Sequence, residues 1–102
     1  MPRLMHSVYF TLHDRTAAKA AELAVACHKY LNVQPGIVFF AAGVCSPDLD
    51  RPVNDRDYDV ALHLLFVDRA AHDAYQTDPT HGQFITECQA GWARVRVFDA
   101  DV

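Results

Sequence analysis

Residues 58–81, YDVALHLLFVDRAAHDAYQTDPTH, encode a strand, a helix and a helix break in direct succession. The first part, Tyr58–Phe66, is apolar and rich in residues that favour strands. Asp68 can cap the helix that follows, because its carboxylate can accept the free N–H groups of a first turn. Proline lacks an N–H and disfavours helical backbone in the preceding residue, so Pro79 ends this helix and can begin a second one that runs to about Cys88.

The break places a phenol and an imidazole six residues apart, at Tyr75 and His81. In a first helical turn His81 meets the positive end of the helix dipole, which favours its neutral, proton-accepting form. A weak acid beside a neutral base can transfer protons, so we predict that Tyr75 and His81 are a catalytic pair. A packed core tyrosine and an ordinary histidine near a helix start fit the same spacing, and the spacing leaves both interpretations open.

The rest of the chain supplies three more strands and a long helix. His6–Leu12 alternates, with His6 on the face of the apolar residues and a serine, a tyrosine and a threonine on the other face. We expect further elements in an amphipathic helix that ends at Tyr30, a strand over Ile37–Cys45, a solvated loop over Ser46–Asp57 and a strand over Ala93–Phe98. The order βαββα(α)β predicts an α+β, ferredoxin-like fold, a four-stranded antiparallel sheet with helices on one face, in a single domain over residues 1–102.

The second face of this sheet is predicted to be partly apolar. Ala61 and Leu65 share it with the more polar Asp59 and His63. Because a large apolar patch is rarely left in water, we expect a second copy of the chain to cover this face and form a homodimer.

Composition excludes several classes of partner. The chain has 102 residues, of which 51% are hydrophobic and 22% charged, and no apolar run approaches the roughly 20 residues of a membrane span. The net charge is −4, and no cluster of lysines and arginines predicts nucleic-acid binding. The start of the chain does not resemble a signal peptide, and three cysteines without a CxxC pair fit reduced thiols. We therefore expect a soluble cytoplasmic protein with no membrane and no nucleic-acid partner.

The sequence predicts neither a metal site nor a cofactor. Its six histidines form no HxH or HxxxH pair beside a carboxylate at ligand spacing, and the acidic loop lacks the glycine and final glutamate of a calcium loop. Cys27 falls on the helix face expected to meet the sheet, where a packed thiol is favoured over a nucleophile that has no evident activating partner.

In this context the chain resembles the stress-responsive dimeric α/β-barrel (Dabb) domains over nearly its whole length. The resemblance rests on the early histidine in MHSVYFTL, the proline-ended first helix LNVQPGI, the segment from residue 58 to 81 and the closing WARVRVFD. It implies a ferredoxin-like monomer whose sheet packs against that of a second copy to form a barrel.

One plant member of the family, olivetolic acid cyclase, closes a linear polyketide with a tyrosine and a histidine that correspond to Tyr75 and His81. Its pocket histidine corresponds to His6, and its wall aromatics correspond to Phe84 and Trp92. A further pocket histidine of the cyclase is replaced by Val60 here, and aromatic residues on its first helix are replaced by Leu23 and Cys27. The resemblance therefore implies a less polar, differently shaped pocket.

We predict from these observations a small-molecule pocket between sheet and helices, for a hydrophobic or carbonyl-containing ligand. Cyclase, isomerase or lyase chemistry without a cofactor would follow if His81 abstracts a proton beside a carbonyl and Tyr75 binds the developing oxyanion. The alternative is a non-catalytic homodimer that has a structural or partner-binding role under stress. Beside the catalytic pair, the predicted ligand-binding residues are His6, Val8, Phe10, Leu23, Cys27, Val60, Leu62, Phe84 and Trp92.

Overall fold

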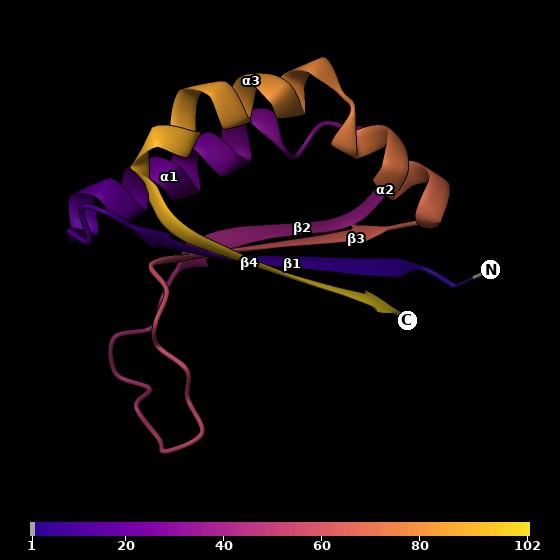
Figure 1. Cartoon of the computed structure of the whole chain (residues 1–102). Coiled ribbons are helices and arrows are strands. Elements are labelled where there is room, and N and C mark those ends of the chain that lie inside the picture. The colour runs from indigo at the N-terminus through magenta and orange to yellow at the C-terminus, as the bar shows by residue number, and fades with distance from the viewer. Residues whose placement is uncertain (1) are drawn as a thin grey trace.

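The computed structural model describes residues 2–102. Along these residues the elements are β1 (Leu4–Leu12), α1 (Ala17–Tyr30), β2 (Ile37–Val44), β3 (Val60–Phe66), α2 (Arg69–Gln76), α3 (Pro79–Cys88), the short 3-10 helix η1 (Gln89–Gly91) and β4 (Trp92–Asp101). The strands form one antiparallel sheet in the order β2-β3-β1-β4, with the helices packed on one face (Figure 1). The predicted ferredoxin-like order βαββα(α)β is confirmed.

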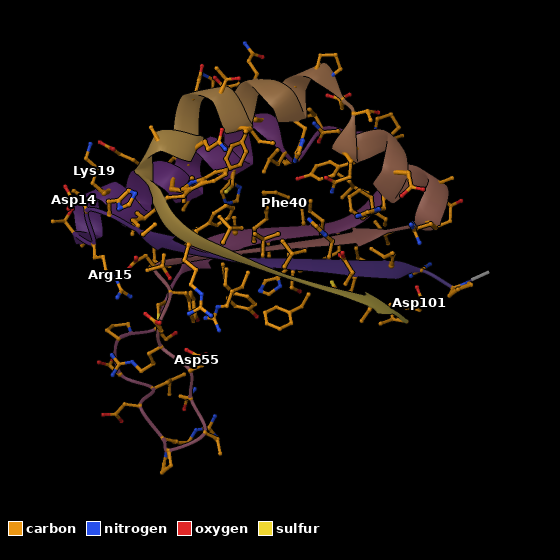
Figure 2. All side chains as sticks on the ribbon, viewed as in Figure 1. Asp14, Arg15, Lys19, Phe40, Asp55 and Asp101 are labelled. Atoms are coloured by element: carbon orange, nitrogen blue, oxygen red, sulfur yellow. The ribbon has the colours of Figure 1, made fainter. Side chains whose placement is uncertain are left out.

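The alternating strands place one set of side chains against the helices. In β1 the residues Leu4, His6, Val8 and Phe10 are buried, and the residues between them are only partly covered. In β3 the same alternation buries Val60, Leu62, Leu64 and Phe66. Figure 2 shows Phe40 of β2 in the layer between sheet and helices, where its ring lies 4.9 Å from that of His28 on α1. This layer is the hydrophobic core.

Side-chain caps fix where the helices begin. Thr16 accepts a hydrogen bond from the backbone N–H of Lys19 and caps α1. Asp68 accepts one from Ala71 N at 2.8 Å and caps α2, as predicted. Asp78 accepts one from Thr80 N at 2.8 Å and caps α3, whose first residue is Pro79. The break between α2 and α3 therefore follows from the Asp-Pro pair.

The loop between β2 and β3 extends away from the sheet on the side opposite the helices (Figure 1). Ion pairs hold it in place: Arg96 of β4 donates to Asp55 at 2.8 Å, and Arg15, in the connection between β1 and α1, donates to Asp59 at 3.1 Å. Figure 2 shows Asp55 within this loop and Arg15 near its base. Each exposed pair contributes little alone, but together they attach an otherwise solvated segment to β4 and to the start of α1.

The two ends of the described chain meet at one side of the sheet. Arg3 and Val102 exchange two backbone hydrogen bonds, of 2.9 and 3.0 Å, where β1 and β4 begin and end. Across residues 2–102, none of the helices combines the length and hydrophobicity that a membrane crossing requires.

Candidate functional site

A cavity of about 190 Å³ lies between the sheet and the helices α2 and α3. Its walls are mostly apolar, and its polar side chains are two histidines, one tyrosine and one glutamine. The lining residues are His6, Val8, Phe10, Leu62, Tyr75, Gln76, His81, Phe84, Ile85, Trp92, Val95 and Val97. The volume is below the few hundred cubic ångströms of an ordinary ligand pocket, but cavities of about 150 Å³ can bind a molecule the size of benzene.

Tyr75 and His81 meet in this cavity because the chain turns between α2 and α3. Tyr75 lies in the last turn of α2, and His81 is the third residue of α3. Their ring centroids are 4.5 Å apart, with the planes inclined at 56°. Tyr75 is buried and His81 half-buried, so both rings are withdrawn from bulk water. In the described part of the chain no hydrogen bond joins these two side chains, so each is available to form a hydrogen bond with a ligand.

The surroundings favour the uncharged forms of both groups. Burial lowers the pKa of His81 below its usual value, the nearby imidazole of His6 lowers it further, and the carboxylate of Asp78 acts in the opposite direction. Burial raises the pKa of Tyr75 well above its usual value, and the negative charge that Cys27 carries when it is ionised raises it further. Near neutral pH the site therefore holds a neutral imidazole that can accept a proton and a phenol that can donate a hydrogen bond. The direction for His81 is the predicted one, although burial is its main cause.

His6 has a partner that the sequence did not indicate. Its Nδ1 lies 2.5 Å from Oδ1 of Asp99, the residue opposite it in the pairing of β1 with β4. Its ring centroid lies 6.0 Å from that of Tyr75 and 5.3 Å from that of His72. Asp99 therefore fixes the orientation of the imidazole at one end of the cavity.

The structure brings eight of the eleven predicted site residues to the cavity. They are His6, Val8, Phe10, Leu62, Tyr75, His81, Phe84 and Trp92.

The remaining three predicted residues lie elsewhere. Cys27 and Val60 are fully buried in the core, and Leu23 lines a separate cavity on another side of Trp92. Burial raises the pKa of the Cys27 thiol to about 12, which argues against a nucleophile at this position.

Four further residues line the cavity and were not predicted from the sequence: Gln76, Ile85, Val95 and Val97. Val95 and Val97 are opposite Phe10 and Val8 in the pairing of β4 with β1, so the cavity continues along the edge of the sheet. The alternation of WARVRVF places these two valines on one face of the strand. The pairing of β4 with β1, once known, identifies this face as the one that lines the cavity.

Next to the cavity, around its lining residue His6, one set of side chains has donor atoms suited to a metal ion. His6, His72 and Asp99 each offer one ligand atom, and these atoms lie within 4.8 Å of one another. The three residues come from β1, α2 and β4 and are far apart in the sequence, so they form no short sequence motif.

A family model described as the Stress responsive A/B Barrel Domain, Dabb, matches residues 4–102. The chain belongs to this family. No curated protein is close enough in sequence to count as a relative of this Dabb domain.

Solved structures share its fold at low sequence identity. A dimeric ferredoxin-like protein of unknown function from Thermobifida fusca is 19% identical, with a TM-score of 0.79 over 99% of this chain and 92% of that one. A Dabb family protein from Mesorhizobium loti is 23% identical, with a TM-score of 0.76 over 98% and 96% of the two chains. A hydroxynitrile lyase from Passiflora edulis is 19% identical, with a TM-score of 0.75 over 99% and 94%.

Proposed function

We propose that this Dabb domain binds a small carbonyl compound in the cavity and catalyses proton transfer beside the carbonyl without a cofactor. The observation that carries the proposal is the contact of the Tyr75 and His81 rings, 4.5 Å apart, in a cavity with mostly apolar walls. An apolar cavity with a few convergent polar groups is the usual form of a ligand site.

His81 would serve as the base in this reaction. Its pKa is lowered, so at neutral pH the ring is unprotonated and can take a proton from the carbon next to the carbonyl. Tyr75 stays protonated because burial raises its pKa, and its O–H would donate to the oxygen on which negative charge develops. The protonated His81 then returns the proton to the product, so the enzyme is regenerated without any external reagent.

The volume of the cavity limits the substrate. About 190 Å³ accommodates a single ring or a short branched chain, not a long polyketide. We therefore propose isomerase or lyase chemistry on a small aldehyde or ketone in preference to polyketide cyclisation. The existence of a hydroxynitrile lyase with this fold supports small-molecule lyase chemistry on such a scaffold.

A ketone of about the same size as benzene tests the proposal before the natural substrate is known. Cyclohexanone in D₂O exchanges its α-protons when a base removes them, and ¹H NMR follows the loss of signal. We expect exchange faster than in buffer, and a decrease of about 10²-fold or more in His81→Gln, the range for loss of a general base. Tyr75→Phe should also be slow, because it lacks the hydrogen-bond donor.

The matched control is His13→Gln, which removes an exposed imidazole outside the cavity. It should leave the exchange rate unchanged. Equal rates in the wild type and His81→Gln would show that the mechanism is wrong. Quenching of Trp92 fluorescence by cyclohexanone without any exchange would show binding without catalysis, and the absence of both quenching and exchange would support the non-catalytic alternative.

That alternative has its own support, because the cavity is small and Tyr75 is almost wholly buried. Under it, the chain acts through its assembly and not through chemistry. Both proposals include a homodimer formed through the face of the sheet that the helices leave open.

Aromatic side chains on this open face support the homodimer. Phe39 and Phe98 are each more than half exposed, and the ring of Tyr9 lies 5.8 Å from that of Phe98. Several solved proteins with this fold are described as dimeric. Sedimentation should give a dimer at micromolar concentration, and Phe98→Asp should weaken it at least about tenfold, because burying a carboxylate without a partner is costly. A wild-type chain that sediments as a stable monomer contradicts this proposal.

A further inference from the structure

Three side chains, of which His6 also lines the cavity, converge from distant parts of the sequence. His6 lies on β1, His72 on α2 and Asp99 on β4, and one nitrogen or oxygen atom from each lies within 4.8 Å of the other two. The proposed acid/base reaction uses neither His72 nor Asp99 to move protons. Two imidazoles and a carboxylate are a common set of three protein ligands for zinc and related ions, with further positions left open.

The two histidines are withdrawn from water. The side chain of His6 is 7% exposed and that of His72 is 14% exposed. The ring of Phe66 lies 6.3 Å from that of His6 and 5.6 Å from that of His72, and so forms an apolar wall behind both. An apolar wall of this kind limits the access of water to a metal site.

The neighbours of His72 prepare it to act as a ligand. Its Nδ1 lies 3.0 Å from Oδ1 of Asp73, a carboxylate that can accept the ring N–H. Its Nε2 then carries a lone pair, and the amide nitrogen of Gln76 lies 3.4 Å away as a weak donor. A carboxylate that accepts the second N–H of a ligand histidine is the usual outer partner in zinc sites, where it orients the ring and increases its basicity.

We propose that His6, His72 and Asp99 bind a divalent transition-metal ion of the Zn²⁺ type. The present contact between His6 Nδ1 and Asp99 Oδ1, at 2.5 Å, is a hydrogen bond. Two donors that share one tetrahedral ion at about 2.0–2.1 Å are roughly 3.3 Å apart, so Asp99 must move by roughly 0.8 Å. The Asp99 side chain is 42% exposed on an edge strand, so it has room for this shift. The ion replaces the proton between the two residues.

Zn²⁺ alone is the probe for this site. The whole chain, without a histidine tag and stripped of metal, is titrated by calorimetry, and Co²⁺ is used in parallel because its visible absorption reports the ligand geometry. A tag at either end must be removed, because Arg3 and Val102 flank the strands that carry His6 and Asp99. We expect one ion per chain and little competition from Mg²⁺, which prefers oxygen ligands.

Two substitutions identify the ligands. His72→Ala and Asp99→Asn should each weaken Zn²⁺ binding by at least about tenfold, since even outer partners of a zinc site are worth that much. Each should also change the Co²⁺ spectrum. Asp99→Asn keeps the shape of a half-exposed side chain, so it remains informative if His72→Ala unfolds. His13→Gln, which removes an exposed imidazole outside this cluster, is the matched control and should bind as the wild type does.

Three results would overturn the proposal: no saturable binding, the same affinity in Asp99→Asn as in the wild type, or an equal loss in His13→Gln. In each case the three residues form only a hydrogen-bonded cluster. No substrate is needed for these measurements, so their outcome is independent of the proposed proton transfer.

Discussion

Gly36 couples the stability of the fold to the position of the cavity residues. It lies between α1 and β2 with a φ of 86°, a conformation that residues with a Cβ rarely adopt. A Cβ at this position would lie 2.5 Å from Cβ of Ala71 on α2 and 3.5 Å from Cγ1 of Val67. We predict that Gly36→Ala is strongly destabilising for two separate reasons.

The magnitude follows from the two costs. A left-handed conformation costs about 1–2 kcal/mol for a residue with a Cβ. The contact with Ala71 must open by roughly 1 Å, and forced overpacking of this kind costs about 1–3 kcal/mol. The free energy of unfolding should therefore fall by about 2–5 kcal/mol, which lowers Tm by about 10 °C or more in a domain of this size.

A second substitution separates the two costs. In Ala71→Gly the opposing Cβ is absent, so Gly36→Ala should then cost only about 1–2 kcal/mol. Urea unfolding of the four variants, followed by far-ultraviolet circular dichroism at one protein concentration, gives the coupling energy. The reasoning is refuted if Gly36→Ala costs less than about 1 kcal/mol, or if it costs the same in both backgrounds.

The same substitution should disturb the site. Ala71 lies one helical turn before Tyr75 and directly precedes His72, so any displacement of α2 moves both of these residues. Gly36→Ala should consequently weaken ligand binding in the cavity even at temperatures at which the variant is folded.

Two further predictions concern ionisable groups. The folded-state pKa of His81 is lowered, so the unfolded chain binds a proton more readily, and the folded state should lose stability as pH falls below about 6.5 until the lowered value is passed. Urea titrations between pH 7 and 5 should show that the free energy of unfolding depends less on pH in His81→Gln than in the wild type. The same pH dependence in both proteins would contradict a lowered pKa for His81. Burial raises the pKa of Cys27 from 9.0 to about 12, which lowers its thiolate fraction about a thousandfold. Under iodoacetamide at pH 8, mass spectrometry should find the folded protein labelled at the partly exposed Cys45 long before Cys27, and early labelling of Cys27 would show that the core opens.

The sequence predicted the fold well where local chemistry decides it. Asp68 and Asp78 are good helix caps, and Pro79 can only begin a helix or end one, so the break between α2 and α3 follows from three residues. The alternation in β1 identified the buried face correctly, because a strand has two faces and only one of them is apolar. Strand ends were less accurate: β3 begins at Val60 and not at Tyr58.

The candidate site was only partly predictable, since its remaining contacts depend on strand pairing. His6 and Asp99 are 93 positions apart and meet only because β4 pairs with β1 at the edge of the sheet. No spacing rule for ligands on one element can detect such a pair. Cys27 and Leu23 illustrate the opposite difficulty: both belong to α1, and helical periodicity does not indicate which part of the interior remains hollow.

The hydrogen bonds between Arg3 and Val102 hold these two residues close enough together for a circular permutation of the chain. A short glycine-serine linker could join these ends, and new ends could be opened at Asp50-Arg51 in the loop between β2 and β3. In such a circular permutant β1 and β4 would become neighbours in a hairpin, and the cost of bringing them together in the unfolded chain would fall. In the present chain β1 and β4 are far apart in sequence, so their pairing is the least local in the sheet. In the permutant this pairing would be local, and the part of the sheet that carries His6 and Asp99 should therefore fold faster. The folded structure should stay the same.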